Sequence, residues 1–306
     1  MKLPKSVKIK EVGPRDGLQN EKQTIPTEDK ITWIDSLSKT GLSYIEVSSF
    51  VHPKWIPQLA DASEVLGKIQ REQGVTYAAL VPNLRGLERA LVANVDEVSI
   101  FMSASEAHNK NNINKSIEET YPILSEVVKE AKAAGKTVRG YLSTVIGCPY
   151  EGPVAASQVR KVSDRLFSMG IDELSLGDTI GVGVPNQVEK LLEELLPHFD
   201  ANKLAMHFHD TRGTALANIV KSLEMGITIF DSSLGGLGGC PYAKGASGNV
   251  ATEDLLYMLH GMGIETGIDI DTVMESAKLI EKVRGKKLNS RQMDILNAEE
   301  GAVCNG

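Results

Sequence analysis

Cysteine is scarce in this sequence: the 306 residues contain only Cys148, Cys240 and Cys304, without a CxxC pair. An odd and sparse count argues against a disulfide framework and is typical of a reducing cytosol, so we expect a cytoplasmic protein. Long apolar runs are also missing. No segment reaches the roughly 18 apolar residues of a membrane span, and no apolar signal segment follows the first residues. We therefore expect no membrane association.

Positive charge is in the minority, with 33 Lys and Arg against 40 Asp and Glu and a formal net charge of −7. Sequence-independent nucleic-acid binding needs a basic surface, so this balance argues against a nucleic-acid partner. The hydrophobic content of 42% and the charged content of 24% are typical of a soluble globular enzyme. Low-complexity linkers and breaks in composition are absent as well. We therefore interpret residues 1–306 as a single catalytic domain with a large core.

Strand-like and helix-like runs alternate along the chain. Eight runs read as strands, most of them rich in Val, Ile, Leu or Phe: Val7–Val12, Tyr44–Phe50, Thr76–Val81, Glu97–Met102, Thr137–Ser143, Glu173–Leu176, Leu204–Phe208 and Ile229–Leu234. Helical patterns separate them, as at Thr27–Lys39, Ile117–Ala134, Val154–Met169, Gln187–Leu196 and Ala215–Met225. Such alternation implies parallel strands with right-handed crossovers, which close naturally into a (β/α)₈ TIM barrel of the α/β class. An open doubly wound sheet is the alternative, but no GxGxxG follows the first run.

Several predicted helices end at a glycine that suits the residue just past a helix: Gly41, Gly135, Gly170 and Gly226. Two further helical stretches, Leu255–Met262 and Thr272–Val283, follow the eighth unit. From Lys286 onward the chain is polar, and we expect this tail to be partly mobile. Residues 252–306 are therefore predicted to be a C-terminal helical extension and tail on the barrel.

The stretch His207-Phe208-His209-Asp210 closes the seventh strand-like run. Strand side chains alternate, so both imidazoles lie on the same face. Two imidazoles side by side at a strand end can hold one metal ion, because histidine is the commonest protein metal ligand. A pair of hydrogen-bonded core histidines is the alternative interpretation.

Polar residues gather at the ends of the other predicted strands, where the active sites of such barrels lie. They are Arg15 and Asp16 after the first run, Glu46, Ser48 and Ser49 in the second, Arg139 and Tyr141 in the fifth, and Asp178 after the sixth. Each has a structural alternative. Arg15 and Asp16 could form a turn ion pair, and Glu46 could be a core carboxylate held by Arg15. Asp178 could cap the next helix. Their shared placement favours a site.

Asp16, Asn249 and the two histidines would form a mixed oxygen and nitrogen ligand set. Such a set suits Mg²⁺, Mn²⁺ or Co²⁺ better than structural Zn²⁺, and it leaves positions for water or substrate. An open metal site implies a Lewis-acid role on a substrate oxygen.

The loop Gly235-Gly236-Leu237-Gly238-Gly239-Cys240-Pro241-Tyr242 follows the eighth strand-like run. Its glycines would let the backbone approach a ligand and let the loop close over it. At the catalytic rim we interpret Cys240 as a functional thiol rather than an incidental cysteine of a surface turn.

Three motifs together resemble the 3-hydroxy-3-methylglutaryl-CoA lyase family: Glu11-Val12-Gly13-Pro14-Arg15-Asp16-Gly17-Leu18-Gln19-Asn20, His207-Phe208-His209-Asp210 and Leu237-Gly238-Gly239-Cys240-Pro241-Tyr242. The first two are shared with a wider group of metal-dependent barrel lyases and synthases. The third is more specific, since the synthases have a Glu-Arg pair in place of Cys-Pro. Cys240 therefore favours the lyase over an acetyl-CoA-dependent synthase of the isopropylmalate or homocitrate type, and over a non-catalytic acyl-CoA- or metal-binding barrel.

The resemblance implies cleavage of 3-hydroxy-3-methylglutaryl-CoA to acetyl-CoA and acetoacetate with Mg²⁺ or Mn²⁺, by a homodimer, in leucine degradation. It implies three sets of residues: Arg15, Glu46, Asp178 and Cys240 as catalytic; Arg15, Gln19, Asn20, Ser49 and Tyr141 as substrate-binding; and Asp16, His207, His209 and Asn249 as metal ligands. Arg15 would stabilise the enolate oxyanion, and the thiol of Cys240 would protonate the enolate carbon. The general base is left open between Asp16 and a histidine. Tail residue Cys304 resembles a regulatory thiol of some relatives, or is a cysteine without a role.

Overall fold

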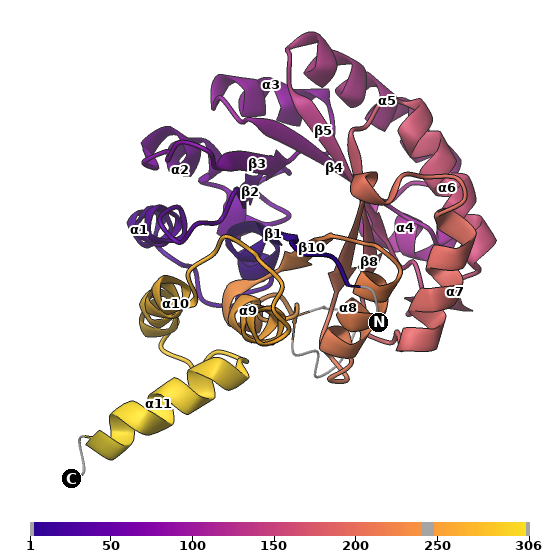
Figure 1. Ribbon diagram of the computed structural model, residues 1–306. Helices are drawn as coiled ribbons and strands as arrows, with labels where there is room; N and C mark the ends of the chain where they lie inside the picture. Colours follow the sequence, from indigo (N-terminus) through magenta and orange to yellow (C-terminus); the bar gives the residue numbers. More distant parts are fainter. Residues whose placement is uncertain (1–2, 240–247, 304–306) are drawn as a thin grey trace.

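Eight parallel strands close into a barrel in the computed structural model, which describes residues 3–239 and 248–303 (Figure 1). The barrel strands are β1 (Lys8–Glu11), β2 (Tyr44–Ser49), β3 (Thr76–Leu80), β4 (Glu97–Ser103), β5 (Thr137–Ser143), β8 (Glu173–Asp178), β9 (Leu204–Phe208) and β10 (Ile229–Ser232). Their order around the barrel is β1-β2-β3-β4-β5-β8-β9-β10, and β10 pairs with β1 to close it. This confirms the predicted TIM barrel and excludes the open doubly wound sheet.

Helices surround the barrel on its outside, except the last one, Arg291–Val303, which packs against the helix Thr252–Gly261 and extends away from the barrel (Figure 1). Within the described residues they are α1 (Thr27–Leu37), α2 (Ala62–Lys68), α3 (Leu84–Val92), α4 (Glu106–Ile113), α5 (Ile117–Ala133), α6 (Ala156–Ser168), α7 (Pro185–Leu195), α8 (Ala215–Glu224), α9 (Thr252–Gly261), α10 (Ile270–Arg284) and α11 (Arg291–Val303). A small hairpin of β6 (Gly147–Cys148) and β7 (Gly152–Pro153) follows β5. None of the described helices is both long and apolar enough to cross a membrane.

Local sequence signals account for many of the helix boundaries. The four glycines predicted to end helices all have positive φ angles, between 74° and 100°. At Gly41 a side chain is also excluded by space, because a Cβ there would lie 2.3 Å from the carbonyl oxygen of Gly267. Helix α5 begins with a capping box in which Ser116 and Glu119 exchange side-chain and backbone hydrogen bonds. Helix and strand edges therefore differ from the predicted ones by only a few residues.

The polar tail from Lys286, which the sequence predicts to be partly mobile, contains the helix α11. The carboxylate of Asp254 on α9 accepts hydrogen bonds from the backbone N–H groups of Arg291 and Gln292 at 3.0 and 2.9 Å. These N–H groups belong to the first turn of α11, where a helix has no partners of its own. The side chain of Met293 is buried at 1% exposure. A carboxylate distant in sequence thus starts this helix together with a local cap, since Ser290 Oγ accepts a hydrogen bond from Met293 N at 3.3 Å.

The barrel interior contains a chain of buried charges rather than aliphatic layers alone. Lys10 Nζ lies 2.9 Å from Glu173 Oε1 and 3.6 Å from Glu97 Oε1. Arg139, which is fully buried, places Nε 2.5 Å from Glu173 and Nη2 2.6 Å from Asp231 Oδ1. Each buried charge is therefore paired, as burial requires. The chain leads along the interior toward the carboxyl ends of the strands.

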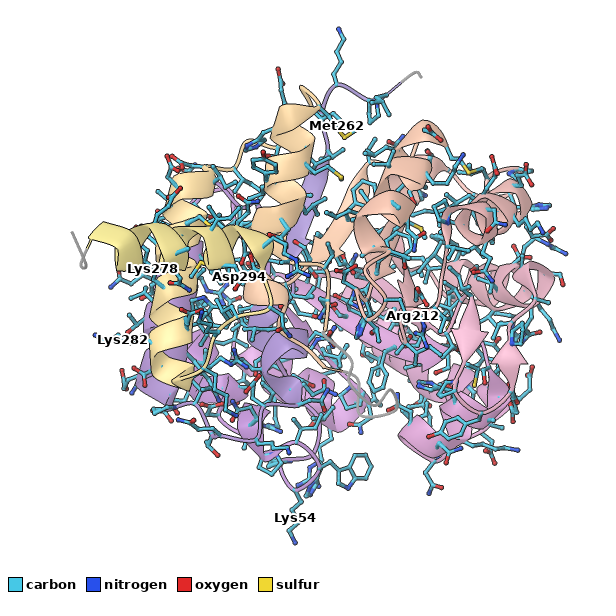
Figure 2. All side chains as sticks on the ribbon, turned by 90° about the horizontal axis from the view of Figure 1, so that it is seen from below. Lys54, Arg212, Met262, Lys278, Lys282 and Asp294 are labelled. Atoms are coloured by element: carbon cyan, nitrogen blue, oxygen red, sulfur yellow. The ribbon has the colours of Figure 1, made fainter. Side chains whose placement is uncertain are left out.

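Figure 2 separates the two ends of the barrel. Met262, which caps the end of α9, lies at one end, and Lys54, in the connection after β2, lies at the other. The connections that follow the carboxyl ends of the parallel strands meet at the end with Lys54. Catalytic residues of such barrels come from this end, and the site described next is built there.

Candidate active site

One buried carboxylate fixes the two loops that frame the site. Glu11, the last residue of β1, accepts hydrogen bonds from Gly13 N at 2.7 Å and from Leu234 N at 3.0 Å. Gly13 starts the short helical turn η1 (Gly13–Gly17), and Leu234 starts the turn η4 (Leu234–Gly236) after β10. Burial raises the pKa of Glu11 to about 7 despite these donors. The first and eighth strand connections are thereby held together.

Arg15 extends from η1 and lies between two carboxylates. Its Nε donates to Glu46 Oε2 at 2.5 Å, and its Nη1 donates to Asp16 Oδ1 at 2.6 Å. Tyr141 completes the arrangement, since its hydroxyl donates to the same Glu46 oxygen at 3.1 Å and its ring lies 5.0 Å from the guanidinium. Burial would lower the pKa of Arg15, but Glu46 and Asp16 outweigh it and raise the pKa. Arg15 is therefore a fixed positive charge.

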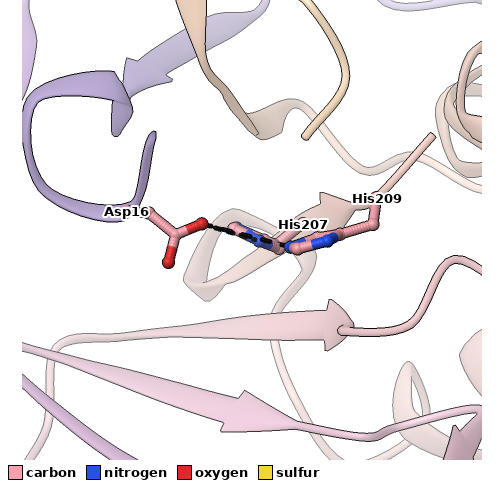
Figure 3. Close-up of side chains that lie close together, drawn as sticks. All are labelled: Asp16, His207 and His209. Carbon is pink, nitrogen blue, oxygen red and sulfur yellow. Dashed lines mark ion pairs between the residues drawn. The ribbon is translucent and has the colours of Figure 1, made fainter. Parts of the chain in front are cut away.

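The other oxygen of Asp16 faces the two histidines. Asp16 Oδ2 lies 4.0 Å from Nε2 of His207 and 4.0 Å from Nε2 of His209. One donor atom from each residue lies within 4.8 Å of the other two, and Figure 3 shows the carboxylate and the imidazoles directed toward one another. Burial would raise the pKa of Asp16, but Arg15 and the two imidazoles hold it below its usual range. Burial, with the neighbouring His207, lowers the pKa of His209 to about 4.

These three side chains fit a divalent metal ion. His207 Nδ1 lies 3.1 Å from Asp231 Oδ2, so this carboxylate favours a hydrogen on Nδ1 and a free lone pair on Nε2, the atom that faces Asp16. His209 is neutral and also presents Nε2. A carboxylate and two imidazole nitrogens suit Mn²⁺, Co²⁺ and related divalent ions. The site shown in Figure 3 therefore has the donor chemistry that the sequence predicts.

Asn249, the fourth predicted ligand, lies beside the cluster but presents its amide nitrogen. Its Nδ2 donates to Asp16 Oδ2 at 2.8 Å and to the Leu237 carbonyl at 2.9 Å. Gly238 packs against it with φ at +109°, and a Cβ on Gly238 would lie 2.4 Å from Asn249 Nδ2. Only glycine permits this approach. The backbone of the glycine loop therefore runs directly beside Asp16 and Asn249.

A cavity of about 540 Å³ opens onto this cluster. Its lining includes Arg15, Asp16, Gln19, Asn20, Tyr141, His207, His209, Gly238 and Gly239. Asn20 Nδ2 donates to the Gly239 carbonyl at 2.7 Å, which ties the η1 segment to the glycine loop. Cys240 lies outside the described residues, immediately after Gly239. The structure thus brings four of the five predicted substrate-binding residues to one cavity.

Glu46, Ser49 and Asp178 do not line this cavity. Ser49 Oγ lies 3.5 Å from the Leu80 carbonyl and 3.3 Å from Val51 N, so its hydroxyl contacts backbone instead. The pairing of β2 with β3 shifts between Glu46 and Ser48, so the faces of residues past that point cannot be obtained by counting from Glu46.

Asp178 accepts hydrogen bonds from Val182 N at 3.1 Å and Gly183 N at 2.8 Å. Burial raises its pKa, although these two donors lower it. Asp178 therefore stabilises the turn after β8. This role is similar to the helix-capping role that the sequence allows as its structural alternative. Cys148 is also placed away from the cavity, with Sγ 2.9 Å from Ser105 Oγ.

Asp231 is the residue of this site that the sequence interpretation missed. It is 2% exposed and contacts Arg139, Ser175 and His207 with the same carboxylate. Its only sequence signal is an acidic residue within the apolar run Ile229–Leu234. Burial would raise the pKa of Asp231, but Arg139 and His207 lower it strongly, so the carboxylate is ionised.

Comparison with known proteins gives a family match over most of the chain. Residues 6–280 match the family model described as HMGL-like. The chain is 61% identical to hydroxymethylglutaryl-CoA lyase YngG of Bacillus subtilis, with 97% of this chain and 100% of the relative covered. It is 54% identical to the cytoplasmic 3-hydroxy-3-methylglutaryl-CoA lyase of Rattus norvegicus, with 94% of this chain and 84% of the relative covered.

Solved structures agree with this match. The crystal structure of the Bacillus subtilis HMG-CoA lyase superposes with a TM-score of 0.96 at 61% identity, covering 97% of this chain and all of that one. An HMG-CoA lyase from Acinetobacter baumannii, solved in complex with coenzyme A and 3-methylmalate, superposes with a TM-score of 0.90 at 38% identity. That alignment covers 94% of each chain.

We expect Asp231→Asn to weaken Mn²⁺ binding about 10- to 100-fold, the usual effect of removing a carboxylate that orients a histidine ligand. An amide no longer fixes the hydrogen of His207 on Nδ1. Titration of the purified variant with Mn²⁺, followed by calorimetry, measures this. Ser175→Ala is the matched control, because it removes another partner of the same Asp231 oxygen and leaves His207 in contact. Equal losses in both variants would contradict an orienting role for Asp231.

Proposed function

The chain belongs to the HMGL-like family, and on that premise we propose that it is a carbon–carbon lyase that cleaves 3-hydroxy-3-methylglutaryl-CoA to acetyl-CoA and acetoacetate. The observation that carries the proposal is the 61% identity to a named lyase over the whole of that relative, combined with the Asp16–His207–His209 cluster beside Arg15 in one cavity. An acyl-CoA substrate also agrees with the coenzyme A complex of the Acinetobacter relative.

Asp16, His207 and His209 would hold the metal ion, and we include Asn249 as a fourth ligand. This requires the Asn249 amide to turn so that Oδ1 replaces Nδ2 beside Asp16, a rotation that exchanges two groups of nearly equal shape. When bound, a divalent ion supplies a Lewis acid that lowers the pKa of the substrate's tertiary hydroxyl. The hydroxyl proton would pass to Asp16 or to a histidine of the cluster.

Arg15 would stabilise the charge that develops on the thioester oxygen. Cleavage of the C2–C3 bond leaves an enolate on the acetyl-CoA half, and its oxyanion needs a fixed positive donor. Glu46 and Asp16 hold the guanidinium by Nε and Nη1, so its direction is set before substrate binds. We therefore assign Glu46 a role in orienting Arg15. Asp178 would act on the neighbouring turn in the same indirect way.

The enolate carbon must finally receive a proton, and we propose the thiol of Cys240 as the acid. Support comes from the last described residue before it: Gly239 lines the cavity, and its carbonyl is held by Asn20. Gln19 and Tyr141 line the same cavity and are proposed as substrate contacts.

The proposal also covers the metal ion, the oligomeric state, the cellular location and the domain organisation. We infer Mg²⁺ or Mn²⁺ as the physiological ion, with Co²⁺ as a substitute, and a homodimer in the cytoplasm that serves leucine degradation. Residues 1–306 would form one catalytic domain, in which residues 252–306 add α9, α10 and α11 to the barrel. The cluster in Figure 3 and the relatives' names support the metal and the substrate class.

We expect purified protein to cleave 3-hydroxy-3-methylglutaryl-CoA with Mg²⁺ or Mn²⁺, and to lose activity after exhaustive treatment with chelator. Acetoacetate release in a coupled assay measures both. Restoration of activity by added metal is the control for irreversible damage. Full activity without metal would contradict the metal role. Condensation of acetyl-CoA with a 2-oxo acid, with no cleavage, would instead identify a synthase.

We expect Arg15→Gln to lower kcat about 10²- to 10³-fold, the usual effect of losing one oxyanion donor. Metal affinity should change little, because Arg15 contacts Oδ1 of Asp16 whereas the histidines face Oδ2. His209→Ala is the comparison variant and should weaken Mn²⁺ binding directly. Steady-state kinetics and Mn²⁺ titration on both variants test this. A loss of metal affinity in Arg15→Gln equal to that in His209→Ala would make Arg15 a structural partner of Asp16.

We expect Cys240→Ser to bind Mn²⁺ and substrate normally and to turn over about 10²- to 10⁴-fold more slowly, the usual contribution of a general acid. Serine has nearly the same shape, but its hydroxyl is a far weaker acid than a thiol of ordinary pKa, about 8.5. Cys148→Ser is the matched control, because Cys148 does not line the cavity. Near-normal kcat in Cys240→Ser would show that this thiol is not the acid.

A further inference from the structure

The cavity extends away from the metal cluster to the opposite side of the barrel. β4 stands opposite β10 in the barrel order, and the helices that follow β4 contribute lining residues. Apolar side chains, those of Val51, Leu80, Phe101, Ile123 and Leu124, also line the cavity. Asn112 and Lys115 line it as well and are exposed to solvent. The cavity therefore combines the buried polar cluster with an apolar lining and with exposed polar residues.

Lys115 is the one lysine among the described residues that line this cavity. The other cationic lining residue, Arg15, is already engaged by two carboxylates. Lys115 Nζ has no ion pair within 4.0 Å in residues 3–239 and 248–303, whereas nearby Lys110 is paired with Glu106 at 3.3 Å. Glu119 lies in the first turn of α5, four residues after Lys115. Its carboxylate accepts a hydrogen bond from Ser116 N at 2.8 Å. Lys115 helps to lower the pKa of the exposed Glu119 through space, but no ion pair among the described residues holds its ammonium group, so this group can reach a ligand.

The corner between α4 and α5 holds Lys115 in a defined place. Asn109, which is fully buried, accepts a hydrogen bond from Ser103 N at 3.0 Å. Its Nδ2 donates to the Lys115 carbonyl at 2.9 Å and to Thr120 Oγ1 at 2.8 Å. Asn114, just before Lys115, ends α4 in the left-handed conformation with φ at 56°. A buried amide therefore ties the Lys115 backbone to the end of β4.

We propose that Lys115 binds the phosphate groups of the coenzyme A portion of the substrate. This inference rests on the proposed function, which places the thioester at Arg15. An acyl-CoA carries its phosphates at the far end of a long pantetheine arm. With the thioester beside the buried Arg15, the arm would pass along the apolar lining, and the phosphates would lie toward solvent, where Lys115 is exposed. A lysine is a strong point charge for a phosphate.

Steady-state kinetics of Lys115→Gln tests this proposal. We expect KM for 3-hydroxy-3-methylglutaryl-CoA to rise about three- to tenfold, as for an exposed charge that meets a phosphate, with kcat within about twofold of wild type. Lys115→Glu should raise KM further. Lys110→Gln is the matched control, because Lys110 carries the same charge on the adjoining helix and does not line the cavity. An unchanged KM in Lys115→Gln, or equal changes in both Gln variants, would overturn the proposal.

Calorimetric titration with coenzyme A alone separates this inference from the proposed reaction. Lys115→Gln should bind coenzyme A about three- to tenfold more weakly than wild type. Wild type and variant should respond equally to pantetheine, which lacks the phosphates. If wild type cleaves no substrate but the coenzyme A difference remains, the proposed reaction fails and the role of Lys115 stands. If wild type shows no binding of coenzyme A, or the variant binds it equally well, Lys115 does not have this role.

Discussion

The site depends on one buried carboxylate, that of Asp231 on β10. It neutralises Arg139 inside the barrel at 2.6 Å, and its other oxygen contacts His207 at 3.1 Å. The same carboxylate therefore stabilises a buried charge of the core and orients His207, a predicted metal ligand. Leaving a buried charge without its partner typically costs about 3–5 kcal/mol. A substitution of Arg139 should therefore also disturb the position of His207, because both side chains contact Asp231.

The position of this interaction in the topology adds a second constraint. β1 and β10 are the first and last strands of the barrel, and their pairing places Lys10 beside Asp231 and Glu11 beside Ser232. Asp16 follows β1, whereas His207 and His209 come from the end of β9 and its connection. These donors meet only when the barrel is closed, so a metal held by them would bind the folded chain and stabilise it.

The sequence predicted the parts of this structure that local chemistry decides. Apolar runs and glycine-terminated helices identified the barrel, and the rule that strand ends meet on one face brought Arg15, Asp16, His207 and His209 together. Ser49 contacts backbone and does not line the cavity, in a strand whose pairing with β3 shifts between Glu46 and Ser48 without any composition signal. Asp231 was missed because its partner Arg139 lies far away in the sequence and becomes a neighbour only after folding. The start of α11 has a local signal, the capping Ser290, and a distant partner, Asp254, that only the folded chain brings near.

The net charge of the chain also predicts less than the positions of individual charges in the folded structure. A net charge of −7 argues against a polyanionic partner such as nucleic acid, yet a coenzyme A thioester is also an anion. The two conclusions are compatible because charges in salt act over a Debye length of about 8 Å, so a ligand responds to the residues that line its cavity. Both Arg15, which is buried, and Lys115, which is exposed, line that cavity. Net charge decides against an extended basic surface, whereas the placement of two cations in a defined cavity decides what that cavity can hold.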